Sequence, residues 1–366
     1  MIKYLQIDYM GRRKLWFAIS GTIVLIGLVS LATRGLNLGI DFRGGVQITF
    51  KTTNFTPLSK VRAQMQLIGH AKDAVVQGRG TSQSGEDYKS FQIRLKKLTN
   101  GEQDKLNSAL RDNLHAVSPG IKNVSSSFGK QIARSAVIAV IFSLLIITLY
   151  IAVRFHGLAF AVPVIVALVH DIVVTVGVYS LTGREVTEST VAAVLTVLGY
   201  SIYDTIIIFD RIRENIPIMR RASFATIANV SLWETIRRSL ATTFITLLPV
   251  AALFFFGGST LQDFAFALLI GVTSGAYSSI FIAAPLLTIW KEREPEFARR
   301  KDNTSIEGSV AARLLRQAEV AAAEEPTPAT PVDVVESAVA GETGDSDEKR
   351  ERRRQRRKAR PHGRAR

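Results

Sequence analysis

The chain of 366 residues contains no cysteine, which excludes disulfide bonds, thiolate metal sites and a catalytic cysteine. It also lacks a GxxxxGK[ST] loop, which excludes an ATP-driven motor of the P-loop type. HExxH and GxSxG are missing as well, and the five histidines are scattered, so zinc hydrolases and elbow-type serine hydrolases are not indicated. We therefore expect no enzyme and no bound cofactor or metal.

Long apolar stretches are abundant, and hydrophobic residues make up 47% of the chain. These stretches alternate with one polar block near the N-terminus and a charged C-terminal tail. This segregation is typical of a polytopic membrane protein rather than a soluble domain. The net charge of +15 is uneven, because much of it comes from residues 349–366.

Segment length and charge predict an α-helical membrane protein with six transmembrane helices. The expected helices are 15–33, 135–153, 158–181, 190–209, 239–256 and 264–290. The first is interpreted as a retained helix, since its apolar run is long and no A-x-A-like cleavage site follows it. The other expected segments are an N-terminus over 1–14, a polar block over 34–134, an amphipathic loop over 210–238 and a disordered tail over 291–366.

Basic residues in the short loops predict the orientation. The RRK sequence before the first helix, Arg154 and the loop 210–238 fall on one side. The two opposite loops, TGREVTEST and GGSTLQD, have one basic residue between them. The basic side is the cytoplasm, so both termini are expected to be cytoplasmic.

The polar block over 34–134 is then extracytoplasmic and has a folding pattern of its own. GGVQITFK, DAVVQG, YKSFQIRLKKL and IKNVSSSF have the character of strands. PLSKVRAQMQLIGH and NGEQDKLNSALRDNLHAV have apolar residues at helical spacing. The order βαββαβ predicts a ferredoxin-like module of the α+β class between the first two spans.

Two acidic residues interrupt the apolar runs. Asp204 lies in the fourth span, and such a carboxylate costs about 2.5–3.5 kcal/mol on insertion scales. Asp171, preceded by His170, lies about halfway along the third span. Ionisable residues at membrane depth often mark proton or ion routes, and His titrates near neutral pH. A proton relay and a static contact between helices both remain open for these residues.

The segment LNLGIDFRGG directly follows the first span. By their chemistry, its glycines and acid form a tight turn at the membrane exit, made by Gly39, Asp41, Gly44 and Gly45. As a string, it resembles the LG-x-D-x-x-GG signature of the SecD/SecF protein-export family.

Two further segments support the same resemblance. GYSIYDTIIIFDRIREN is similar to that family's GYS-x-NDT-x-x-x-x-DRIREN, with Tyr203 in place of the usual Asn. SLWETIRRSLATT resembles the family's SINQTLSRT-x-x-T, and Arg238 falls on the family's arginine. The family's membrane-embedded Asp and Arg, implicated in proton transport, correspond to Asp204 and Arg238. Our hypothesis is that Asp204 carries a proton and that Arg238 tunes it.

The resemblance implies a SecF-type accessory subunit of the Sec translocon, within the RND superfamily. Such a subunit works with SecD and uses the proton motive force to assist preprotein export across the bacterial cytoplasmic membrane. The implied partners are SecD, the SecYEG channel, the translocating preprotein and YajC, and the energy source is the proton gradient. Two alternatives remain: an RND-type exporter of lipids or small molecules, and an assembly scaffold that does not transport.

The C-terminal tail is acidic and rich in Ala, Pro and Thr before it becomes strongly basic. Its composition predicts a disordered linker. The basic end suits contact with anionic lipid headgroups, or secondly with ribosomal RNA.

Overall fold

The computed structural model describes residues 7–67, 74–79, 82, 87–96, 98–257, 259–310, 312–313 and 316–317. The chain divides into a compact unit, Met1–Ala312, and a C-terminal segment, Arg313–Arg366. The membrane-spanning helices and a four-stranded sheet both belong to the compact unit. The basic end of the tail, 349–366, lies outside the described residues.

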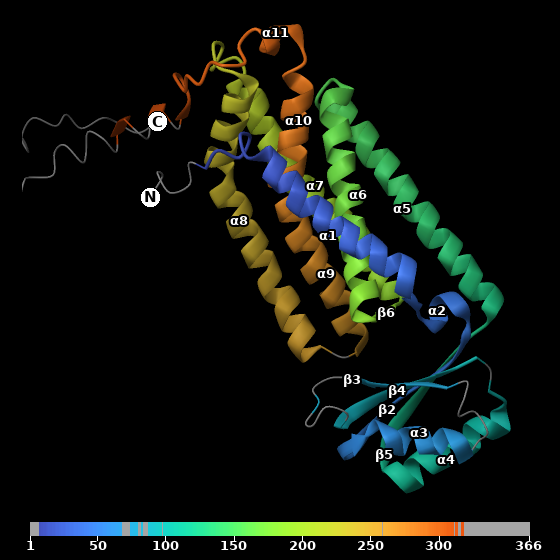
Figure 1. Ribbon diagram of the computed structural model, residues 1–366. Helices are drawn as coiled ribbons and strands as arrows, with labels where there is room; N and C mark the ends of the chain where they lie inside the picture. The colour runs from blue at the N-terminus through green and yellow to red at the C-terminus, as the bar shows by residue number, and fades with distance from the viewer. Residues whose placement is uncertain are drawn as a thin grey trace, which may run out of the picture. The chain divides into compact units, whose positions relative to one another are not determined.

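Six helices among the described residues are long and apolar enough to cross a membrane, which confirms the predicted number of spans. Figure 1 shows them running alongside one another. The first five are α1 (Arg13–Arg34), α5 (Ser126–Arg154), α6 (Leu158–Thr182), α7 (Glu188–Asn215) and α8 (Phe224–Phe256). The sixth is continuous over α9 (Ser259–Ser278), the π-helical turn η2 (Ser279–Ala283) and α10 (Ala284–Lys291).

Capping side chains define where several spans begin. Ser125 and Ser223 each accept a backbone N–H three residues further on and so cap the first turns of α5 and α8. Thr187 and Thr190 form a reciprocal cap at the start of α7. Between such ends the apolar sequence leaves the backbone to satisfy its own hydrogen bonds, as a span in hydrocarbon requires.

The helices extend beyond their predicted ends. The segment 210–238 is not a loop, because α7 continues to Asn215 and α8 begins at Phe224. Arg211 and Arg213 lie on the last turn of α7, Arg220 and Arg221 lie between the two helices, and Arg237 and Arg238 lie within α8. Likewise α5 begins at Ser126 rather than at 135. Charge marks the edge of the hydrocarbon, whereas a helix continues to its cap.

Residues before the first and after the last membrane-spanning helix pack against the helices, including the first part of the predicted tail. Residues 7–12 pack on α8, where Asn229 Oδ1 accepts the amides of Tyr9 and Met10 at 3.0 and 3.1 Å. After α10, the short helix α11 (Pro295–Ala298) places the ring of Phe297 5.0 Å from that of Phe224. Buried aromatic contacts therefore order residues that composition alone assigns to a linker over 291–366.

The sheet contains β2 (Gly45–Pro57), β3 (Val75–Arg79), β4 (Asp87–Leu95) and β5 (Ala116–Val124) in the order β3-β4-β2-β5. All three pairings are antiparallel, and Ile48 of β2 lies opposite both Ile93 and Ile121. Helices α3 (Leu58–Leu67) and α4 (Asn100–Leu114) cover one face (Figure 1). Their apolar sides and the sheet share one core, which includes Ile48, Phe50, Val61, Met65, Phe91, Ile93, Leu106 and Leu110.

The other face of the sheet is polar, because side chains alternate along each strand. It contacts two short segments that connect the spans: β1 (Asn37–Leu38) after α1, and β6 (Glu185–Val186) between α6 and α7. These two pair in parallel, and α2 (Ile40–Arg43) follows β1. The segments that follow α1 and that connect α6 with α7 therefore meet at the polar face of the sheet.

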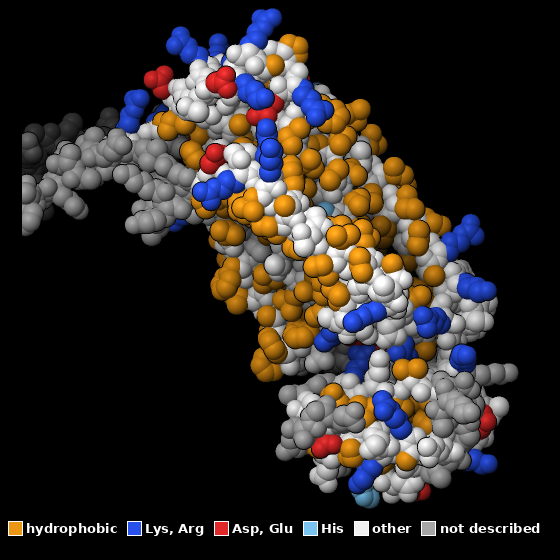
Figure 2. Space-filling model, in the orientation of Figure 1, with side chains coloured by type: hydrophobic (Ala, Val, Ile, Leu, Met, Phe, Trp, Pro, Cys, Tyr) orange, Lys and Arg blue, Asp and Glu red, His pale blue; other side chains and the backbone are white. Residues whose placement is uncertain are grey.

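Large apolar side chains remain exposed along the helices. Figure 2 shows them over the helical part, with Lys and Arg gathered toward its two ends. Examples on α1, α5 and α8 are Leu25, Val29, Phe142, Leu145, Leu149, Phe244 and Ile245. Such a surface suits lipid and marks the chain as a multi-pass membrane protein.

Candidate functional site

Asp171 of α6 is fully buried and accepts four polar contacts. On Oδ1, the hydroxyl of Ser274 donates at 2.6 Å and His170 Nδ1 lies at 3.2 Å. On Oδ2, the hydroxyls of Ser201 and Ser278 donate at 2.7 and 2.8 Å. The carboxylate therefore connects α6 with α7 and with the sixth span.

Small residues make this arrangement possible. A Cβ added to Gly275 would lie 2.8 Å from the Cβ of Ser201, and one added to Gly271 would lie 2.4 Å from Val197. Helices α7 and α9 therefore approach too closely for larger residues. This close packing places Ser201 within reach of Asp171.

His170 has one ring nitrogen engaged and one free. Its Nε2 is buried and has no hydrogen-bond partner within the described part of the chain. The ring lies beside that of Tyr277, with centroids 6.2 Å apart. The pair His170–Asp171 thus combines a well-satisfied carboxylate with an imidazole whose Nε2 makes no hydrogen bond among the described residues.

Asp204 of α7 is also buried, but it is poorly satisfied. Thr243 of α8 donates to its Oδ2 at 3.4 Å, and Tyr200 donates to Thr243 at 3.4 Å. The other oxygen, Oδ1, has no hydrogen-bond partner among the described residues. The hydroxyl of Ser239 on α8 also faces this carboxylate. A buried carboxylate oxygen without a hydrogen bond is a site that can receive a proton.

Arg238 does not contact Asp204, although the two residues are expected to act together. It is exposed on α8, and its Nη2 donates to the hydroxyl of Tyr203 at 3.3 Å. No ion pair between Asp204 and Arg238 exists in the described structure. Tyr203, the residue before Asp204 on α7, is thus the residue that contacts the arginine.

Hydroxyl groups connect the neighbours of Asp204 with the neighbours of Asp171. Thr205, next to Asp204, and Ser279 have their Oγ atoms 2.8 Å apart. Ser279 also donates to the backbone carbonyl of Ser201, and the hydroxyl of Ser201 donates to Asp171. Ser279 opens the π-helical turn η2, and such turns are frequent at functional sites.

The glycine-rich turn after α1 is explained by steric contacts. A Cβ on Gly39 would lie 2.7 Å from Glu185 Oε1. Gly44 and Gly45 have φ values of 74° and 133°, and a Cβ on either would lie 2.6 and 2.5 Å from backbone atoms of Ser126 and Leu95. A side chain at these positions would separate the turn from β6, α5 and β4.

Asp41 of this turn joins the sheet to α7. Its Oδ1 accepts Lys122 Nζ of β5 at 2.6 Å, and its Oδ2 accepts the amide of Glu188, the first residue of α7, at 3.3 Å. Burial opposes the charge of Lys122, but the hydrogen bond and charge of Asp41, with Glu188 and Glu185, raise the pKa of Lys122. A negative charge is also favourable at the first turn of a helix.

Buried ion pairs complete this junction. Glu185 accepts Gln92 Nε2 at 2.7 Å and lies 3.2 Å from Arg79 and 3.3 Å from Arg94. Asp263 at the start of the sixth span lies 2.7 Å from Arg79. Arg184 contacts Asp263 as well, at 3.1 Å. Charges from the sheet are thus neutralised by acids from the ends of the spans.

Several of these residues are not identified by sequence reasoning. Sequence reasoning notes Ser201 in the GYSIYD motif, and Ser274 and Ser278 as small residues that permit close packing of the sixth span. It does not identify these serines as partners of Asp171, because hydroxyls are common in membrane helices. Glu185 and Asp263 are acids in short loops, and their partners lie on distant strands. Only the three-dimensional register reveals such pairs.

Comparison with known families gives two matches. The model described as "Protein export membrane protein SecD/SecF, C-terminal" matches residues 105–293. The "SecD/SecF GG Motif" model matches residues 29–54, which contain the turn analysed above.

Individual relatives agree. The chain is 36% identical to "Protein translocase subunit SecF" of Streptomyces coelicolor over 89% of this chain and 90% of that protein. It is 37% identical to the protein of that name from Calditerrivibrio nitroreducens, covering 78% and 94%. The crystal structure of SecDF from Thermus thermophilus matches with a TM-score of 0.73 and 34% identity, over 78% of this chain and 39% of that one. With these motifs, spans and relatives, the chain belongs to the SecD/SecF family of protein export membrane proteins.

Proposed function

We propose that the chain is a SecF-type subunit of the protein translocase and assists preprotein export together with a SecD-type partner at the SecYEG channel. The names of its relatives support this role. The Thermus protein named SecDF is matched over 39% of its length, which leaves room there for a SecD portion. The outward apolar side chains of α8 suit a partner within the membrane.

Asp204 is the residue that would couple this work to protons, and its burial with an open Oδ1 is the observation that carries the proposal. A proton bound there would neutralise the charge of the carboxylate, and release of the proton would restore it. The carboxylate would thus take up a proton from one side of the membrane and release it to the other. Arg238, held by Tyr203 beside α7, would change the local field when it moves. The proton gradient serves as the energy source, with no cofactor and no enzymatic reaction.

Asp171 and His170 would either relay protons along the same pathway or fix the helices around it. Four contacts hold Asp171 as a hydrogen-bond acceptor, so its main role is to fix α6, α7 and the sixth span around the site. The free Nε2 of His170 is the group in this pair that suits proton relay.

The sheet domain would lie outside the cytoplasm and contact the emerging preprotein. Its strand order β3-β4-β2-β5, with α3 after β2 and α4 after β4, supports the proposal of a ferredoxin-like module. Basic residues at the opposite ends of the spans favour cytoplasmic termini in a bacterial cytoplasmic membrane. YajC, and anionic lipid or ribosomal contacts of the basic tail, are further proposed interactions.

Cells depleted of their resident SecF-type subunit provide the test. The full chain, expressed with its SecD partner, is expected to restore secretion of a signal-bearing reporter and to co-purify with SecD. Restored secretion without retained SecD would contradict the proposed partnership. An exporter of lipids or small molecules would leave secretion unrestored. A non-transporting scaffold would restore secretion equally well with Asp204→Asn.

A further inference from the structure

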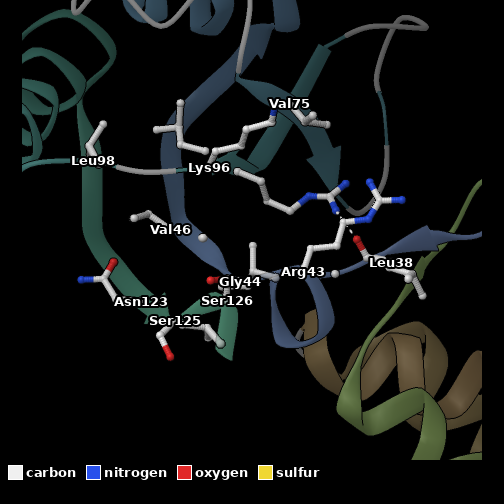
Figure 3. Close-up of a pocket in the computed structure, with 16 residues that line it drawn as sticks. Leu38, Arg43, Gly44, Val46, Val75, Lys96, Leu98, Asn123, Ser125 and Ser126 are labelled. Carbon is white, nitrogen blue, oxygen red and sulfur yellow. Dashed lines mark hydrogen bonds between the residues drawn. The ribbon is translucent and has the colours of Figure 1, made fainter. Parts of the chain in front are cut away.

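A cavity of about 810 Å³ lies between the sheet and the glycine-rich turn, away from the buried acids of the bundle. Much of its lining is apolar: Leu38, Ile40, Val46, Val75, Leu95 and Leu98. Its charged lining residues are all basic, namely Arg43, Arg94 and Lys96. Figure 3 shows Leu38, Arg43 and Gly44 along one side of the cavity and Val75 with Lys96 along another.

Arg94 is a buried cation with an unused donor. Its side chain is 9% exposed, and Nη1 lies 3.3 Å from Glu185, which Arg79 also contacts. Its Nε is buried and has no hydrogen-bond partner in the described part of the chain. Burial lowers the pKa of Arg94, Glu185 opposes this, and the charges of Arg79 and Arg43 add to the lowering. The surroundings therefore favour an additional anion.

Arg43 and Lys96 supply two further positive charges. Both are exposed, and neither makes an ion pair with a described residue. Arg43 has one long hydrogen bond, from Nη2 to the carbonyl of Leu36 at 3.4 Å. Both cations are therefore available to a ligand that enters the cavity.

The cavity lies at the level of the membrane interface. Gly44, which lines it, packs against Ser126 at the start of α5. With 29 residues, α5 is about 43 Å long, longer than a hydrocarbon core of about 30 Å, so its first turns lie among headgroups. Lys130 and Arg134 are exposed on these turns, as is usual where side chains face anionic headgroups.

An apolar groove adjoins the cavity on the membrane side. Leu38 lines both the cavity and this second space of about 420 Å³. The groove is formed by side chains of α5, α6 and α7, among them Val137, Ile141, Val176 and Val194. A molecule at this place would meet cations at one end and hydrocarbon-like surface at the other.

We propose that the cavity binds an anionic phospholipid, with its phosphate against Arg43, Arg94 and Lys96 and its apolar part against the Leu38 side. A free anion would use the cations and leave the apolar lining uncovered. A neutral lipid would leave the donor of Arg94 unmatched. The site stands apart from the proton-carrying residues, so it does not depend on the function proposed above.

The full-length chain in detergent is titrated with phosphatidylglycerol or phosphatidylcholine, and bound lipid is counted by native mass spectrometry. Arg43→Gln combined with Lys96→Gln is expected to weaken phosphatidylglycerol binding about 30-fold, which corresponds to about 2 kcal/mol for two cations. The control, Lys60→Gln combined with Arg62→Gln, removes two exposed charges of α3 on the other face of the sheet. It is expected to leave binding unchanged.

Thermal melting of both double variants, and of Arg43→Lys as a charge-preserving reference, separates lost binding from lost folding. An equal loss in the control, or equal binding of the two lipids by the wild type, would overturn the proposal. So would displacement of the lipid by millimolar inorganic phosphate, which would identify a free-anion site. An acidic peptide that competes for Arg43 and Lys96 while phosphatidylglycerol does not bind would identify a polypeptide site instead.

Discussion

Arg238 donates to the hydroxyl of Tyr203 at 3.3 Å rather than to the carboxylate of Asp204. Tyr203 neighbours Asp204 on α7, so the tyrosine holds the arginine beside the acid without pairing the two charges. The Oδ1 of the acid makes no hydrogen bond with a described residue. This arrangement separates the group that would bind a proton from the group that would respond to it.

Tyr203→Phe removes this contact and is expected to reduce proton-coupled export. Stability should change by about 1 kcal/mol or less, because a single exposed hydrogen bond contributes little. Tyr150→Phe, at a comparably exposed tyrosine of α5, is the matched control. Export and melting temperature are measured for both variants. Wild-type export by Tyr203→Phe would show that the position of Arg238 does not matter.

The two buried acids should respond differently to amide substitution. Asp171→Asn places an NH₂ group among donors that now bind a carboxylate, and it should destabilise the protein by about 3 kcal/mol. Asp204→Asn disturbs only weak contacts, the one of 3.4 Å with Thr243 and one with Ser239, and should cost less than about 1 kcal/mol. Thermal melting in one detergent provides the comparison. The reverse order of stabilities would contradict the anchoring role of Asp171.

Gly39→Ala tests the steric explanation of the turn. The new Cβ would lie 2.7 Å from Glu185 Oε1, so we expect a loss of about 1–3 kcal/mol, typical of overpacking. Gly21→Ala in α1 is the control, because nothing lies within 4 Å of its Cβ and alanine favours helix. If both variants melt at the same temperature, Gly39 is not required by packing against Glu185.

The Lys122–Asp41 pair should make stability depend on pH in the alkaline range. The folded-state pKa of Lys122 lies above its ordinary 10.5, so its contribution is complete below that value and is lost as the pH rises through the folded pKa. Melting of wild type and Lys122→Gln is compared from pH 7 upward, with Lys105→Gln on α4 as control. The wild type should be the more stable near pH 7, and the difference should shrink above about pH 10.5. A difference that grows there would contradict the pairing.

Sequence reasoning finds the spans well because each is an uncharged run long enough to cross a bilayer. It also finds Asp171 and Asp204, because a single acid is conspicuous in such a run. The strands β2 and β4 coincide with the alternating segments GGVQITFK and YKSFQIRLKKL. These features depend on local composition and periodicity, which one sequence displays directly.

Pairings between distant segments are less accessible. The serines around Asp171 come from helices whose relative rotation is set by packing, for example by Gly275 against Ser201. The partner of Arg238 is Tyr203 because α7 and α8 meet with these faces together. The start of α8 at Phe224 depends on the cap at Ser223, which charge-based prediction of a loop over 210–238 overlooks.

The most direct test of the account is proton flux measured together with preprotein export in proteoliposomes that contain the chain, its SecD partner and SecYEG. Asp204→Asn is compared with Asp210→Asn, which changes a carboxylate on the same helix that is already paired with Arg154 at 3.1 Å. The account predicts that Asp204→Asn abolishes proton-dependent export and its flux, whereas Asp210→Asn retains both. Wild-type flux and export by Asp204→Asn would contradict it.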